Sequence, residues 1–128
     1  MITQALCKEI PKIVLHDHLD GGLTIDRIEQ IYHKEGWTLP WTSRGDLWIQ
    51  AKAHSLSLPD YLETFQITLR CMQKKEYIRD IVLDTIRDLS QDNVAYAELR
   101  FCPELCTREG LSSMEVLDTA TAALREAK

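Results

Sequence analysis

Two histidines one residue apart end an apolar run in the segment Ile13-Val14-Leu15-His16-Asp17-His18-Leu19-Asp20-Gly21-Gly22. Alternate side chains of a β-strand point the same way, so His16, His18 and Asp20 are predicted to share one face, with Asp17 on the other. The Cα atoms of the two histidines would lie roughly 6.5 Å apart. Both rings could then reach one zinc ion, and the glycines let the chain turn where the strand ends.

The order of the predicted elements indicates an α/β fold. We predict a strand over Ile10–Asp20, apolar on both faces as in a parallel sheet covered by helices, and a second strand over Val94–Cys102. Predicted helices lie between these strands and after them, so the connections are helical crossovers. A parallel sheet of two strands leaves both edges open. The sequence therefore predicts a piece of a larger α/β domain.

Capping residues and apolar periodicity predict the helices. Thr24 is expected to cap a helix that ends at Gly36, a short helix is expected around Asp46–Ala53, and Ser112 with Glu115 forms a predicted capping box for the last helix. The predicted apolar stripe of the last helix is Met114, Leu117, Ala120, Thr121 and Leu124.

Two further stripes predict helices in the middle of the chain. One comprises Leu58, Tyr61, Leu62, Phe65, Leu69 and Met72, and the other runs from Tyr77 to Leu89. Such a stripe is most often core, although the first could also roof a pocket as an apolar lid.

The position of the histidine pair favours a metal site over histidines that only hydrogen-bond to backbone. The pair ends a buried strand, where α/β barrels place their catalytic groups, and His16 and His18 are the predicted metal ligands. A catalytic zinc ion needs three protein ligands. Because His33 and His54 are expected to be solvated, the remaining ligands are expected outside these residues.

Two other clusters carry weaker signals. His33-Lys34-Glu35 with Cys102 and Cys106 superficially resembles the zinc motif of cytidine-type deaminases, but the spacing of the cysteines is one residue too long. Glu98 and Arg100 share a strand face and are expected to pair with each other or with later strands, as a structural ion pair rather than as support for a metal site.

Composition excludes several classes of protein. The 128 residues carry a net charge of −5 without a basic patch, so no nucleic-acid partner is expected. No apolar window is long enough to predict a membrane span, and no secretory leader is apparent. Four cysteines in such a chain are expected to be free thiols in a reducing compartment, which favours a cytoplasmic protein.

Three segments together resemble the adenosine deaminase family of metal-dependent amidohydrolases. They are Pro11–Gly22, Ser57–Phe65 and Ala95–Pro103, which are similar to that family's first barrel strand, lid helix and second barrel strand. The resemblance implies that residues 1–128 are the N-terminal portion of a (β/α)8 TIM barrel, with two barrel strands plus helices, truncated before the barrel closes. It also implies a purine nucleoside as the binding partner.

The resemblance also implies an activity and roles for single residues. The implied reaction is zinc-dependent hydrolytic deamination of adenosine and 2′-deoxyadenosine to the inosine product and ammonia. His16 and His18 would bind Zn2+, and His18 and Asp20 would contact the nucleoside. The residues implied to cover the purine are Leu58, Tyr61, Leu62 and Phe65.

The family's other metal ligands and its proton-donating glutamate have no match in this sequence. We therefore expect the chain alone to be inactive when it is assayed with zinc for inosine production. Alternatives are a related deaminase acting on adenine, AMP or a modified purine nucleoside, or a non-catalytic binding module if the chain naturally ends at Lys128.

Overall fold

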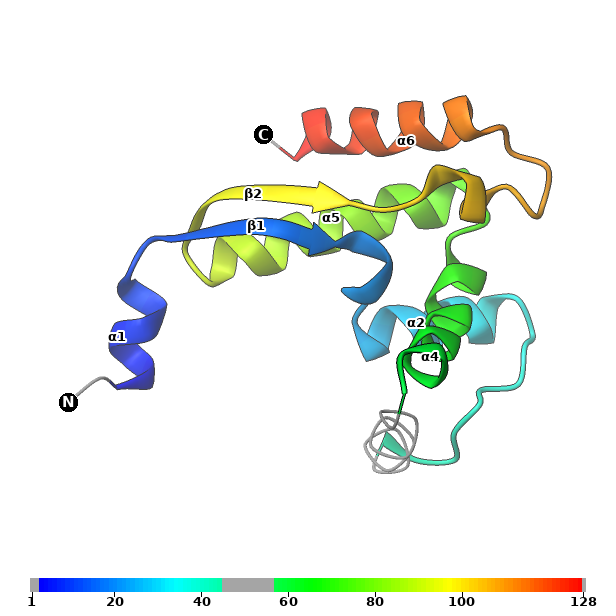
Figure 1. The fold of residues 1–128 in the computed structure, drawn as a ribbon, viewed down its shortest axis with the longest axis horizontal. Coiled ribbons are helices and arrows are strands. Elements are labelled where there is room, and N and C mark those ends of the chain that lie inside the picture. The colour runs from blue at the N-terminus through cyan, green and yellow to red at the C-terminus, as the bar shows by residue number, and fades with distance from the viewer. Residues whose placement is uncertain (1–2, 45–56, 128) are drawn as a thin grey trace.

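Two parallel strands form the sheet in the part of the chain that the structure describes, residues 3–44 and 57–127 of a computed structural model (Figure 1). Strand β1 (Lys12–His18) pairs with β2 (Val94–Arg100), with Lys12 opposite Val94 and His18 opposite Arg100. The predicted strands are confirmed, but β1 ends two residues early because Leu19–Gly21 forms a single-turn 3-10 helix, η1. A second 3-10 helix, η2 (Pro103–Cys106), follows β2.

Helices connect the two strands, as expected for crossovers. The described helices are α1 (Gln4–Glu9), α2 (Ile25–Lys34), α4 (Leu58–Cys71), α5 (Lys75–Gln91) and α6 (Ser113–Glu126). Helix α5 contacts β2. The order of strand, helices, strand and helix confirms the predicted α/β class. The short helix expected around Asp46–Ala53 lies outside the described residues.

The predicted caps are confirmed. Thr24 Oγ1 accepts a hydrogen bond from the backbone N–H of Arg27 at 3.2 Å, and the chain leaves α2 through Gly36 at a φ of 67°. Ser112 and Glu115 form the reciprocal capping box of α6. These contacts satisfy backbone donors that have no partner inside the helix.

Two burial predictions are wrong. Ile13 and Leu15 were expected to be buried but are 69% and 62% exposed. Helix α5 contacts the sheet at β2, whereas the sheet face that carries Ile13, Leu15 and Tyr96 is left open in the described part of the chain. On α6 the predicted stripe residue Ala120 is buried, together with Val116 and Ala123, whereas the stripe residues Met114, Leu117 and Leu124 are exposed. Both sets have helical spacing, and the smaller side chains face the core.

The core lies where α2, α4, α5 and α6 meet η1 and η2. Its fully buried members include Leu19, Ile31, Met72, Ile78 and Val116. The four cysteines, all within the described residues, are free thiols, as expected. None of the described helices is long and apolar enough to cross a bilayer.

A partly buried ion-pair cluster joins α2 to α5. Arg27 Nε donates to Asp84 Oδ2 at 2.6 Å, and Arg27 Nη1 donates to Asp80 Oδ2 at 3.2 Å. Burial would raise the pKa of the Asp84 carboxyl, but the hydrogen bond and charge of Arg27, with a smaller contribution from Arg87, lower that pKa below its usual value. The charged form of Asp84 therefore stabilises the fold.

Replacing Asp84 is expected to destabilise the protein in a pH-dependent way. Asp84→Asn should lower the free energy of unfolding at pH 7 by about 1–3 kcal/mol, because Arg27 loses a charged partner. A carboxyl group whose pKa is lower in the folded protein than in the unfolded chain stabilises the fold fully at pH values above its unfolded pKa of about 3.9. This contribution is lost as the pH falls through the pKa of the folded protein. The deficit of the variant should therefore shrink below about pH 4.

Urea unfolding of both proteins at pH 7 and at lower pH measures this deficit. Asp88→Asn is the matched control, because Asp88 is exposed on the same helix. An equal loss of stability in the two variants, or a deficit that does not change with pH, would contradict the role given to Arg27 and Asp84.

Candidate metal and substrate site

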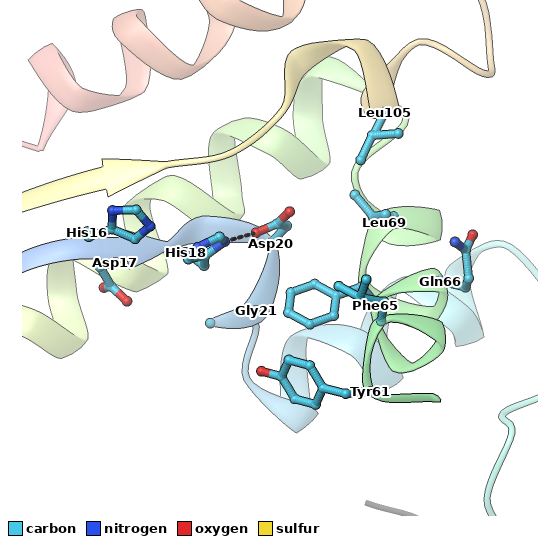
Figure 2. A pocket seen from close by; sticks show the side chains of 12 residues that line it. His16, Asp17, His18, Asp20, Gly21, Tyr61, Phe65, Gln66, Leu69 and Leu105 are labelled. Atoms are coloured by element: carbon cyan, nitrogen blue, oxygen red, sulfur yellow. Dashed lines mark ion pairs between the residues drawn. The ribbon is translucent and has the colours of Figure 1, made fainter. Parts of the chain in front are cut away.

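The two histidines lie side by side at the carboxyl end of β1 (Figure 2). Their ring centroids are 5.2 Å apart with the ring planes tilted by 50°. The strand is irregular here: its register with β2 shifts between Val14 and Asp17, and His16 has a φ of 64°. Such a backbone is uncommon for a residue with a side chain and is found at functional sites. The rings therefore meet at a bulge rather than through regular strand alternation.

Asp20 lies beside the histidines but in η1 rather than in the predicted strand. Its Oδ1 is 3.4 Å from His18 Nδ1 (dashed in Figure 2). This oxygen is buried and accepts no hydrogen bond from the described residues. A buried acceptor without a donor is costly in free energy, so this atom can accept a hydrogen bond from a ligand.

The thiol of Cys106 is close enough to Asp20 to be affected by its charge. Burial raises the pKa of Cys106 to about 12, with the Asp20 carboxylate as the next cause. Cys106 therefore stays a neutral thiol at physiological pH.

Arg100, one strand away, contacts His16. Its Nη1 lies 3.2 Å from His16 Nδ1 and also hydrogen-bonds with Nε2 of the same ring. Glu98, the partner considered for Arg100, instead accepts a hydrogen bond from the Tyr96 hydroxyl at 2.9 Å. Glu98 and Arg100 form no ion pair in the described part of the chain. The predicted pairing of these two residues with each other is therefore wrong.

The histidines open onto a pocket of about 650 Å³ whose far wall is α4 (Figure 2). Of the four residues implied to cover a purine, Tyr61, Leu62 and Phe65 line this pocket together with His18 and Asp20. Leu58 does not line it and is 68% exposed. Along the predicted stripe, Leu69 and Met72 are buried, with Leu69 also lining the pocket, and Tyr61 and Leu62 are about half exposed over the pocket.

The predicted site residues are joined at the pocket wall by Asp17, Gly21, Gly22, Gln66, Leu69 and Leu105. Asp17 borders it, although its side chain points away from the His16 ring in Figure 2. Gln66 follows Phe65 at the edge of the α4 stripe, and this position in the sequence could have been used to predict that Gln66 borders the pocket. Leu105 comes from η2, and no local pattern in the sequence points to it.

Gly21 sets how closely α4 approaches the end of β1. A Cβ atom on Gly21 would lie 3.2 Å from Phe65 Cε1 and 3.4 Å from Phe65 Cζ. The absence of a side chain therefore lets the Phe65 ring lie against the backbone of η1.

The donors at this site fit a zinc ion as part of a ligand set. Two adjacent imidazoles at one pocket are suitable nitrogen ligands. Asp20 Oδ1, which accepts no hydrogen bond from the described residues, lies next to them. No group of three or more His, Cys, Asp or Glu side chains that could hold a metal occurs among residues 3–44 and 57–127. His33, Glu35, Cys102 and Cys106 therefore do not form the alternative zinc site, and His54 lies outside the described residues.

The comparisons with known proteins agree with this arrangement. The model of the adenosine deaminase family matches residues 11–128, so the chain belongs to that family of hydrolytic deaminases. The adenosine deaminase of Mycobacterium marinum is 40% identical over 125 residues, which is 95% of this chain and 34% of the relative. The chain thus spans about a third of the length of this relative.

Solved structures show the same fold. An Arabidopsis N6-mAMP deaminase superposes with a TM-score of 0.77 at 20% identity, covering 98% of this chain and 37% of that one. An adenine deaminase from Arthrobacter aurescens superposes with a TM-score of 0.78 at 20% identity, covering 91% of this chain and 35% of that one. An amidohydrolase from Burkholderia ambifaria with bound Zn superposes with a TM-score of 0.72 at 19% identity, covering 99% of this chain and 35% of that one. The chain therefore has the fold of the N-terminal part of a TIM-barrel deaminase.

The contact between Gly21 and Phe65 generates a stability prediction. Gly21→Ala should lower the free energy of unfolding by about 1–3 kcal/mol, because the new methyl group overpacks against the Phe65 ring. Gly22→Ala is the matched control: its Cβ would be no closer than 3.5 Å to its nearest neighbour, His18 O. The control should change stability by less than about 1 kcal/mol.

Combining Gly21→Ala with Phe65→Leu tests the cause. The smaller side chain should recover part of the loss, measured as a coupling in a double-mutant cycle of urea unfolding. If the two substitutions change the free energy of unfolding by purely additive amounts, the contact between residues 21 and 65 is not the cause of the loss.

Proposed function

We propose that this chain supplies part of the active site of a zinc-dependent deaminase that converts adenosine and 2′-deoxyadenosine to inosine and 2′-deoxyinosine with release of ammonia. The observation that carries the proposal is the meeting of His16, His18 and Asp20 at one end of a pocket with an apolar wall on α4. Membership of the adenosine deaminase family supports the reaction class.

His16 and His18 are the proposed zinc ligands of this chain. Zinc in hydrolytic enzymes acts as a Lewis acid and provides a nucleophile at neutral pH. Arg100 contacts both nitrogens of His16, and its guanidinium must move away from that ring when His16 binds a cation. The further ligands and the group that protonates the purine are proposed to lie outside these residues, and the chain alone is proposed to be inactive.

Asp20 and α4 are proposed to hold the nucleoside. A ribose hydroxyl would donate a hydrogen bond to the buried Oδ1 of Asp20, which lacks a donor in the described structure. The side chains of Tyr61, Leu62 and Phe65 would cover the purine and exclude water from it. Leu58, at 68% exposure, would join this cover only if the start of α4 moves toward the pocket.

A nucleoside is favoured over a nucleotide at this site. The Asp20 carboxylate lies in a low-dielectric position, where it would repel a phosphate group placed beside it. Adenine, AMP and modified purine nucleosides are the alternative substrates. We also propose a cytoplasmic location, which the four free thiols support.

Zinc affinity tests the proposed ligands directly. His16→Ala and His18→Ala should each weaken zinc binding by at least about 100-fold. Each substitution removes a group that would contact the metal directly, and changes to residues that only hydrogen-bond to such a group already weaken metal affinity by about 10–100-fold. The measurement is competition with a chromophoric chelator, using the protein expressed from its complete reading frame. His33→Ala, an exposed position on α2, should bind zinc like the unaltered protein. An unchanged affinity in the His16 or His18 variant would contradict the assignment.

Activity on a panel of purines tests the proposed substrate. The protein from the complete reading frame should produce inosine from adenosine, with adenine and AMP the poorer substrates, and residues 1–128 alone should produce none. Asp20→Asn should raise the KM for adenosine by about tenfold, because a hydrogen bond to a charged group is lost. Asp118→Asn, on the exposed face of α6, is the control. A preference for AMP would overturn the assignment to nucleosides.

A further inference from the structure

A second pocket, of about 460 Å³, is lined by residues from α2, α4 and the loop after η2. Its lining residues are Tyr32, Gln66, Ile67, Arg70 and Arg108. Gln66 also borders the histidine pocket, so the two pockets adjoin at this residue. The wall of this pocket therefore carries two arginines.

Aromatic rings hold Arg70 in place. Its guanidinium carbon lies 4.0 Å from the centre of the Trp37 ring and 5.6 Å from the centre of the Tyr32 ring. These two rings are themselves packed edge to face, with centroids 5.3 Å apart, and Tyr32 is only 3% exposed. A stacked guanidinium keeps its N–H edge available for an anion, and its stacking reduces the freedom lost on binding.

Neutral hydrogen-bond partners hold Arg108. Its backbone N–H donates to Gln73 Oε1 at 2.9 Å, and its Nη1 donates to Gln66 Oε1 at 3.1 Å. Gln73 is 4% exposed, and its Nε2 donates to the carbonyls of Leu69 and Leu105. A buried amide thus fixes the backbone of Arg108 to the end of α4.

Neither Arg70 nor Arg108 forms an ion pair within the described part of the chain. Arg100 and Arg125 form none there either, whereas the remaining arginines are paired. Those paired arginines are Arg27, Arg44, Arg79 and Arg87. Lys74, one turn after Arg70, is already paired with Glu35. Burial raises the pKa of Tyr32, and the charge and a hydrogen bond of Arg70 lower it in part.

We infer that Arg70 and Arg108 form a binding site for one phosphate group, carried by free phosphate or by a small phosphate ester. Guanidinium groups match the geometry of phosphate oxygens through paired N–H donors, and the pocket is large enough for a small ester. The site is separate from the proposed zinc ligands and does not rest on the proposed function.

Calorimetric titration of the protein expressed from its complete reading frame tests the site. Inorganic phosphate and glycerol phosphate are titrated at constant ionic strength into metal-free protein, and one of them should bind at one site per chain. Arg70→Gln and Arg108→Gln should each weaken that binding by about tenfold, since each removes a charged hydrogen bond. Tighter binding of glycerol phosphate than of free phosphate would identify an ester as the ligand.

Three variants make the test specific. Arg125→Gln removes an exposed charge from α6 and should leave the affinity unchanged, and His18→Ala should do the same. Arg70→Lys keeps the charge but loses the planar stack on Trp37, and should bind less tightly than the unaltered protein. Absence of saturable binding by both probes, or equal weakening by Arg125→Gln, would overturn the inference. Circular dichroism of each variant confirms that it is folded.

Discussion

The burial of Leu19 is the constraint on which the site depends. Leu19 is 1% exposed and belongs to the core between η1, α4 and α5. Because it directly follows His18, its anchoring ends β1 and turns the chain into η1. The residues on either side, His18 and Asp20, are thereby held at the rim of the pocket, and Gly21 is placed against Phe65 of α4. One buried leucine thus links the strand, the pocket and the helix above it.

Local sequence patterns predicted the elements of the fold, because their causes are local. An apolar run, a capping threonine and a capping box act within a few residues, and each is present in the structure. The buried face of α6 was not predictable in this way. Ala120 was predicted to be buried, but Val116 and Ala123 are buried in place of the bulkier Met114, Leu117 and Leu124. Both groups have helical periodicity, and packing against α5 selects between them.

The same division between local and long-range causes applies to the site. Both His16 and His18 line one pocket as predicted, but strand alternation, on which that prediction rested, is not what brings their rings together. The spacing of the two histidines was not sufficient to predict the bulge at His16, because that irregularity depends on the register with β2. The contact of Arg100 with His16 joins residues 84 positions apart. Arg70 and Arg108 likewise line one pocket only because α4 and the loop after η2 are folded together.

Zinc binding by His16 and His18 can be tested by anomalous diffraction at the zinc absorption edge, with crystals of the protein expressed from its complete reading frame and loaded with zinc. One anomalous peak is expected about 2.0–2.1 Å from a nitrogen of each ring, with the Arg100 guanidinium turned away from His16. If no peak lies between the two rings while zinc is bound elsewhere in the protein, these histidines are not the zinc ligands.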